Sequence, residues 1–103
     1  MISNYIMVKV GKYNYEKSTR KDKKLMVTVK VDGKDKTIHF GGNPNTSKHF
    51  KDKTGLLDKK LNHGDNKIKK AWYSRHSKIK KKDGTLAIND PLSPSYHSAK
   101  ILW

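Results

Sequence analysis

The most regular alternation of apolar and polar residues lies in residues 25–41, on both sides of an Asp-Gly pair. Alternation with a period of two is typical of a strand that buries one face. Val27 and Val29 fall on one face of the first strand, and Asp32-Gly33 suits the positive φ angles of a tight turn. The pattern predicts a β-hairpin over about residues 25–41. Its register stays open, because the charged residues after the turn can lengthen the loop.

Two segments before the hairpin have different patterns. In residues 5–10, Ile6, Val8 and Val10 alternate with other residues, which predicts a further strand. Residues 16–24 contain no apolar side chain. We therefore expect these residues to form an exposed, mostly basic loop.

Helical spacing replaces the alternation farther along the chain. One stripe at spacings of four, four and three residues consists of Ile68, Trp72, His76 and Ile79. Such spacing predicts a helix that buries this stripe and exposes its lysines on the remaining circumference. Asp65 is a suitable N-cap, and Gly84 favours a stop beyond the last lysines. The pattern indicates one main basic helix over about residues 65–81.

A chain of 103 residues has room for a single domain, residues 1–103. We expect an α+β fold, in which a small antiparallel sheet built on the hairpin packs with the basic helix and an irregular C-terminal tail. The segments are a strand and hairpin region at 5–41, a loop region at 42–64 with a helical turn at 56–61, the basic helix at 65–82, and an apolar tail at 83–103. Ile101, Leu102 and Trp103 are expected to hold the tail against the core.

Charge changes this picture more than any other property of the composition. The chain has 24 Lys and Arg against 9 Asp and Glu, a net charge of +15, which attracts polyanions. Only two of the cations are arginines, and lysine contacts phosphate as a point charge, so nucleic-acid binding would not depend on base sequence. The predicted polyanion-binding residues are Lys17, Arg20, Lys21, Lys23 and Lys24 on the loop, and Lys67, Lys69, Lys70, Arg75, Lys78, Lys80, Lys81 and Lys82 on the helix. A lysine-rich surface that serves only solubility is the alternative.

The positions of the aromatic residues narrow the type of polyanion, and the absence of certain features excludes other classes of site and protein. Phe40 and Trp72 fall on faces assigned to the core, which favours duplex phosphate or acidic protein over single strands that stack on aromatic rings. The chain has no cysteine, which excludes disulfides and thiolate metal sites. Because no apolar run has the length of a membrane span or the pattern of a signal peptide, we expect a soluble intracellular protein.

The stretch HGDNKIKKAWYSRH, residues 63–76, is the best candidate for a metal or nuclease site. The possible ligands in the chain are His39, His49, His63, Asp65, His76 and His97. No two histidines are three to five residues apart, so we predict no metal site and no cofactor. The alternative to a metal site is a structural role for both histidines. The His63 ring then bonds to the backbone before the helix, and His76 is half-buried on the inner stripe of the helix.

Nuclease chemistry is not favoured either. Asp65 and His76 would lie three helical turns apart, and Glu16 is the only glutamate, whereas two-metal phosphoryl transfer requires clustered carboxylates. We therefore expect a protein without enzymatic activity. Arg75 is open to two interpretations: an ion pair within the fold, to Asp65 or Asp90, or a bidentate grip on an anion.

Several short blocks follow one another in a specific order and spacing. They are SxRKDKK (residues 18–24), TIHFG (37–41), HGD (63–65), YSRHSKIKKKDG (73–84) and SPSYHSAKILW (93–103). Through these blocks, about residues 18–103 resemble a family of small, uncharacterised basic proteins of giant nucleocytoplasmic large DNA viruses. The family supplies no catalytic residue to carry over.

The resemblance implies a large-DNA-virus origin and a product that is packaged in the particle. The expected function is that of a non-enzymatic virion-associated structural protein, a minor capsid or core component, made in the cytoplasm or nucleus of the infected cell. Its basic face would meet other virion proteins, acidic protein surfaces or double-stranded DNA. One alternative is a sequence-nonspecific DNA-binding or DNA-condensing protein, and another is an accessory subunit of viral transcription or replication machinery. The oligomeric state stays open.

Overall fold

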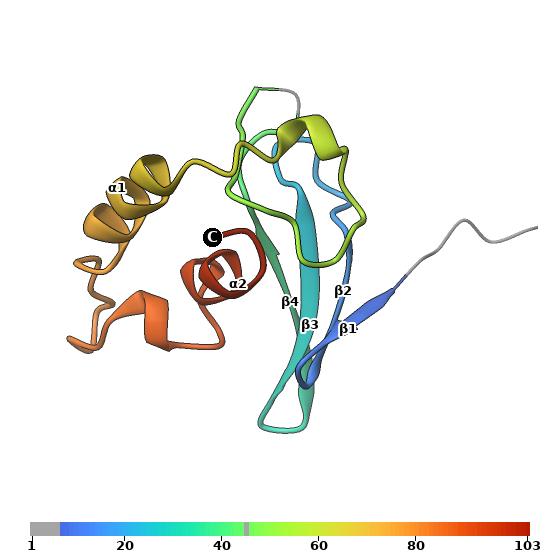
Figure 1. Ribbon diagram of the computed structural model, residues 1–103. Coiled ribbons are helices and arrows are strands. Elements are labelled where there is room, and N and C mark those ends of the chain that lie inside the picture. The colour runs from blue at the N-terminus through green and yellow to red at the C-terminus, as the bar shows by residue number, and fades with distance from the viewer. Residues whose placement is uncertain (1–6, 45) are drawn as a thin grey trace, which may run out of the picture.

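Four antiparallel strands form one sheet in the order β1-β2-β3-β4, and two helices lie on one side of it (Figure 1). The computed structural model describes residues 7–44 and 46–103. The elements are β1 (Val8–Val10), β2 (Tyr13–Lys17), β3 (Leu25–Val31), β4 (Lys34–Phe40), the 3₁₀ helix η1 (Lys59–Leu61), α1 (Asn66–His76), the 3₁₀ helix η2 (Ala87–Asn89) and α2 (Pro94–Ile101). The fold is α+β, as predicted.

The hairpin formed by β3 and β4 confirms the strongest local prediction. Its ladder runs from Leu25 opposite Phe40 to Val31 opposite Lys34. The turn contains only Asp32 and Gly33, whose φ angles are 52° and 79°, as a two-residue hairpin turn with positive φ at both positions requires. The charged residues that follow the turn belong to β4 and do not lengthen the loop.

Two more strands precede the hairpin, and only one of them was predicted. β1 confirms the expected strand at its described residues, whereas Tyr5 and Ile6 lie outside the described residues. β2 includes Glu16, which is buried, so the expectation of an exposed loop from residue 16 onward is wrong at its start. The loop begins only after Lys17, because the alternation of Tyr13 and Tyr15 continues the sheet on its core face.

The core lies on one face of the sheet. Tyr15, Val27 and Ile38 form a row across three strands, and all three are buried. Leu25 and Phe40 extend this face, and α2 covers it with Ile101 and Leu102. The opposite face carries mostly exposed polar side chains, as is usual for an antiparallel sheet with one packed side, but its row of Glu16, Met26 and His39 is buried or half-buried.

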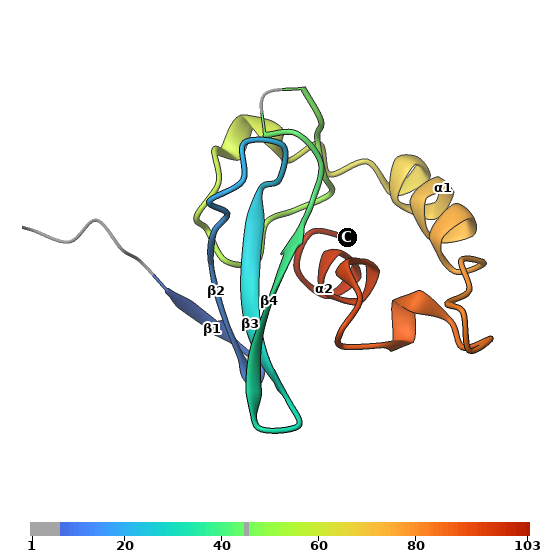
Figure 2. The same ribbon diagram turned by 180° about the vertical axis from the view of Figure 1, so that it is seen from behind.

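The C-terminal tail packs on the core as expected, but it is not irregular throughout. It contains α2, which Ser93 caps by accepting a hydrogen bond from Ser95 N at 3.2 Å, with Pro94 in the first turn. Figures 1 and 2 show that α2 lies beside the sheet and α1 lies farther out. The helix has only eight residues, and Pro91 and Pro94 lie before it and at its first position, so the residue pattern does not indicate it.

His97 places a polar group at the centre of the interior. Its ring is 0% exposed; Nε2 donates to Pro91 O at 2.7 Å, and Nδ1 accepts from the Tyr15 hydroxyl at 2.8 Å. Both ring nitrogens are thus paired in the neutral form, and burial lowers the pKa of His97. The bond to Tyr15 joins the tail to β2, and the bond to Pro91 O connects two residues of the tail.

Helix α1 begins where predicted and ends earlier. Asp65 caps it by accepting from Lys67 N at 2.9 Å, but the helix stops at His76 rather than near residue 81. The predicted stripe is wrong at two positions, because Ile68 and Ile79 are each 44% exposed. Ile79 lies beyond the helix, and α1 contacts the remaining structure along the narrow line that includes Trp72 rather than along a broad face.

A stack of rings attaches α1 to the C-terminus. The Trp72 ring stacks on His76, with centroids 4.1 Å apart, and on Trp103, with centroids 5.2 Å apart. His63 lies next to Trp103, at 5.3 Å. Among the described elements, α1 has no contact with another helix or strand as extensive as that of α2 with β4. The stack and the hydrogen bond from the Tyr73 hydroxyl to Ala99 O at 3.1 Å therefore hold α1.

The loop region between β4 and α1 is attached to the end of α2. Lys51 N and Lys53 N donate to Leu102 O and Ile101 O at 3.1 and 3.0 Å. The expected helical turn at 56–61 is present as η1, over Lys59–Leu61. No helix in the described part of the chain combines the length and the apolar character that crossing a bilayer requires.

Replacement of Trp72 by alanine tests the stack. We expect a loss of roughly 3–5 kcal/mol in the free energy of unfolding, because a large buried ring is removed. In hydrogen exchange, the amides of α1 should lose protection before those of β3. Ile68→Ala on the exposed side of α1 is the control and should change stability by about 0.5 kcal/mol or less. Undiminished protection of α1 in the Trp72 variant would contradict this role.

Candidate functional site

The basic loop before β3 places most of its predicted residues at the surface. Lys17, Arg20 and Lys21 are exposed, and Lys23 is half-buried. Arg20 forms an ion pair with Asp22 at 3.2 Å, between two exposed side chains. Exposed pairs of this kind are weak, so the arginine remains able to bind an external anion.

Lys24 is the exception, and its assignment to a polyanion-binding surface is wrong. It is 3% exposed, and its Nζ lies 3.0 Å from His49 Nδ1. The backbone N–H of Lys24 still donates to Phe40 O at 3.1 Å, so the residue continues the sheet. The loop that carries His49 covers it, which residue patterns near Lys24 do not indicate.

The second predicted group follows α1 and the segment after it. Lys67, Lys70 and Arg75 are exposed on α1, while the half-buried Lys69 lies over the Phe50 ring at 4.5 Å. The remaining residues of this group lie beyond the helix, because α1 ends at His76. They are Lys78, Lys80 and Lys82, which are exposed, and Lys81, which pairs with Asp83 and Asp90.

Arg75 has no ion pair within the described residues. Asp65 caps α1, and Asp90 is paired with Lys81, so neither of the two expected carboxylates reaches Arg75. The predicted structural ion pair is therefore wrong. The guanidinium group is exposed, and a grip on an external anion stays a prediction.

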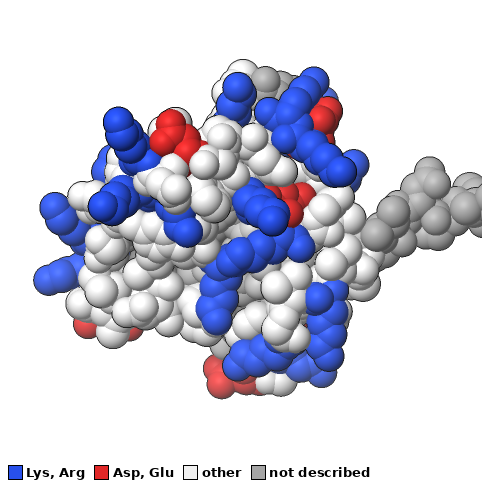
Figure 3. Space-filling model, in the orientation of Figure 1, with Lys and Arg blue, Asp and Glu red and all other residues white. Residues whose placement is uncertain are grey.

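The positive charge is distributed rather than gathered in one stripe. Figure 3 shows Lys and Arg side chains in several groups on the visible face, with uncharged surface between them and with Asp and Glu in a few small groups. The basic loop and the α1 segment occupy separate parts of the fold, since the loop joins β2 to β3 and α1 lies beyond α2. Such a surface can contact an extended polyanion at several places at once.

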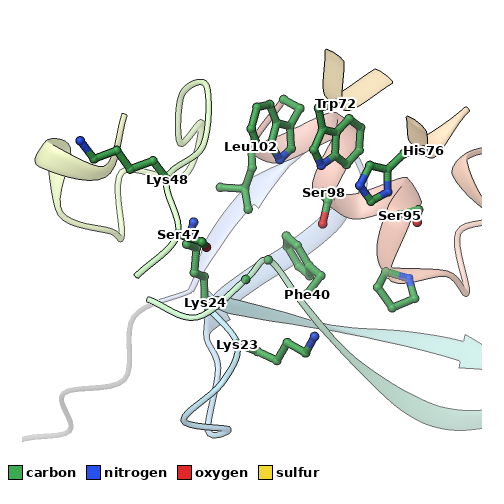
Figure 4. Close-up of a pocket in the computed structure, with 14 residues that line it drawn as sticks. Lys23, Lys24, Phe40, Ser47, Lys48, Trp72, His76, Ser95, Ser98 and Leu102 are labelled. Carbon is green, nitrogen blue, oxygen red and sulfur yellow. The ribbon is translucent and has the colours of Figure 1, made fainter. Parts of the chain in front are cut away.

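A cavity of about 390 Å³ opens between the end of β4, α1 and α2. Three lysines line it, with no Asp or Glu. Figure 4 shows Trp72, His76 and the Ser98 hydroxyl on one side, while Lys48 extends away from them. The cationic groups do not converge on one point, because the Lys24 ammonium is bound to His49. The cavity has a positive field but no assembled anion site.

Lys24 belongs to a buried polar network. His49 Nε2 lies 2.6 Å from Asn62 Oδ1, which also accepts from Asp52 N at 3.0 Å. Burial lowers the pKa of Lys24 to about 8, and nearby Asp52 opposes this change. Burial and the Lys24 ammonium lower the pKa of His49. The network joins residues that are far apart in the chain, so the residue pattern around each of them gives no signal for it.

The histidines of the stretch 63–76 have structural environments. His63 Nδ1 accepts from Asp65 N at 2.9 Å, which confirms the expected bond to the backbone before the helix. His76 is half-buried, and burial, followed by nearby Arg75, lowers its pKa. Within residues 7–44 and 46–103, no three His, Cys, Asp or Glu side chains come close enough together to hold a metal ion.

A second hollow, of about 750 Å³, lies between the β1–β2 turn and α2. The sequence assigned no binding role to the tyrosines and lysines among its lining residues, which are Lys12, Tyr13, Tyr15, Lys53, Tyr96 and Lys100. The alternation of Tyr13 and Tyr15 is a signal that predicts β2, but nothing in the sequence places Tyr96 beside them. The pairing of half-buried tyrosines with lysines is a product of tertiary structure.

The pH dependence of stability tests the Lys24 network through Lys24→Met. The pKa of Lys24 is lowered from 10.5 to about 8, so between these values the unfolded chain binds more protons than the folded one. The free energy of unfolding of the unmodified protein should therefore rise over this range, by up to roughly 3 kcal/mol relative to Lys24→Met. Urea unfolding at several pH values measures it, with Lys30→Met at an exposed position of β3 as control. Parallel pH profiles for the unmodified protein and Lys24→Met would contradict the burial of a charged amine.

The described site thus consists of exposed cations in two groups, a cavity without acids and a hollow of tyrosines and lysines. It contains no assembled catalytic or metal-binding set within the described residues. The resemblance to giant-virus proteins stays a prediction. Comparisons with protein-family models, curated proteins and solved structures give no match for the chain.

Proposed function

We propose that the protein is a non-enzymatic structural component of a large DNA virus particle whose basic surface binds polyanions. The observation that supports polyanion binding is the exposure of six cations that have no ion pair within the described residues. They are Lys67, Lys70, Arg75, Lys78, Lys80 and Lys82. The resemblance of the ordered sequence blocks to giant-virus proteins supports a role as a structural component of the virus particle. The preferred partner is the acidic surface of another virion protein.

The distribution of the cations favours an extended partner over a small one. The basic loop and the α1 segment lie on separate parts of the fold, and lysine predominates in both. Lysine ammonium groups are hydrated point charges on flexible stems, which suits contact with many acidic groups in no fixed geometry. Complementary charge of this kind accelerates association and orients partners more than it adds affinity.

Double-stranded DNA is the second candidate partner. The same exposed lysines support it, because phosphate neutralisation requires accessible cations and no base contacts. In that case the protein would bind or condense DNA without sequence preference. An accessory role in viral transcription or replication is compatible with the same surface.

Duplex binding across a salt series tests the DNA candidate. If 6–10 phosphates are contacted, affinity should fall by roughly 10³–10⁵-fold between 50 and 200 mM salt, because counterions are released on binding. Changing Lys78, Lys80 and Lys82 to Ser should weaken binding and reduce the salt slope by up to about 3.

The matched control changes Lys30, Lys34 and Lys36 to Ser, which removes the same charge from exposed positions of the β3–β4 hairpin. It should weaken binding less than the first variant. Absence of duplex binding at the lowest salt concentration would exclude the DNA candidate and leave acidic protein as the partner.

Cross-linking in purified particles tests the virion role. A carbodiimide joins lysine amines directly to carboxylates, so it should couple Lys67, Lys70 or Lys78 to acidic residues of a neighbouring virion protein. Peptide mass spectrometry identifies the coupled residues and measures the copy number. If purified particles lack the protein, the structural role is wrong whatever the cations bind in solution.

A further inference from the structure

The hollow between the β1–β2 turn and α2 combines aromatic rings with cations and has no acidic lining residue. Tyr13, Tyr15 and Tyr96 supply the rings, and Lys12, Lys53 and Lys100 supply the cations. Its volume of about 750 Å³ lies within the range of roughly 300–1,000 Å³ that is typical of small-ligand sites. The field and the surface chemistry together favour a ligand that is both anionic and aromatic.

Buried neighbours hold the tyrosine rings in place. Tyr13 and Tyr96 lie at 82° to each other with centroids 6.4 Å apart, and both pack edge-to-face against His97, at 5.2 and 5.0 Å. His97 is itself held by Tyr15 and Pro91. Two half-buried rings are therefore positioned before any ligand binds, which reduces the entropic cost of binding.

The lysines show that ring faces are open to the surface. Lys12 Nζ lies over the Tyr13 ring at 5.5 Å, and Lys100 Nζ lies over the Tyr96 ring at 5.0 Å. Both lysines are exposed, so the ring faces beneath them are not covered by the core. A cation over an exposed ring contributes less than a stacked base, so a base can displace the ammonium group. The displaced ammonium remains near enough to bind the phosphate attached to that base.

We propose that this hollow binds a base of single-stranded nucleic acid. The base stacks on Tyr13 or Tyr96, and the flanking phosphates bind Lys12, Lys53 and Lys100. Paired bases in a duplex hide their faces, so duplex DNA cannot use this hollow and binds only the distributed lysines. The proposal rests on the polyanion binding proposed above and adds to it a specific site and strand type.

Paired oligonucleotides test the inference without relying on a variant. Fluorescence anisotropy compares a short oligothymidylate with an abasic strand of the same length, label and charge. The oligothymidylate should bind roughly 5- to 150-fold more tightly, the effect expected for one base on an aromatic side chain. The abasic strand measures the electrostatic contribution alone.

Variants locate the effect in the hollow. Tyr13→Leu or Tyr96→Leu, whichever removes the stacking ring, should lower the ratio of oligothymidylate to abasic affinity toward one. The matching variant, Tyr13→Phe or Tyr96→Phe, should keep the ratio because it keeps the ring. Lys12→Ser should weaken both strands, as should Lys100→Ser. Circular dichroism confirms that each variant is folded.

The outcomes separate this inference from the proposed function. Equal affinity for the two strands would overturn the base-binding site while leaving polyanion binding in place. A preference that neither Tyr13→Leu nor Tyr96→Leu reduces would overturn the assignment to this hollow. Failure of both strands and of duplex DNA to bind at low salt would instead count against nucleic acid as a partner of any part of the surface.

Discussion

The stacking of Trp72 on Trp103 determines how the second half of the molecule is organised. α1 has few other contacts with the sheet or with α2, and its exposed positions include the cations Lys67, Lys70 and Arg75. The stack joins the helix to the last residue of the chain, which follows the buried Ile101 and Leu102. The orientation of the α1 cations therefore depends on one aromatic contact, extended by His76 at one end and by His63 at the other.

The remainder of the interior combines a small apolar core with paired polar groups. Only 33% of residues are hydrophobic, and the sheet is covered on one face alone. Tyr15, His97 and Pro91 form one hydrogen-bonded chain inside, and Lys24, His49 and Asn62 form another. The groups in these two chains are tolerated inside because they are paired, and their bonds connect segments that are distant in sequence, whereas His63 Nε2 and His76 Nδ1 are buried without a hydrogen-bond partner among the described residues.

The same economy of apolar residues explains where binding groups are found. Most cations remain at the surface, because a buried ammonium loses hydration that only a network such as that of Lys24 partly replaces. Tyr15 is enclosed by the core, whereas Tyr13 on β2 and Tyr96 on α2 are half-buried and present rings next to lysines. The two proposed modes of anion binding, by distributed charge and by one hollow with aromatic walls, both use groups that the core leaves outside.

The sequence by itself determined the features that depend on neighbouring residues. The hairpin turn at Asp32-Gly33, the Asp65 cap and the excess of surface lysine are local, because turn geometry, capping and charge act within a few residues. Only the tertiary structure decided that Lys24 is buried, that α1 ends at His76, that Arg75 has no ion pair among residues 7–44 and 46–103, and that Tyr96 lies beside Tyr13. Each of these depends on contacts between segments far apart in the chain, and no local pattern specifies which distant side chain will cover a given residue.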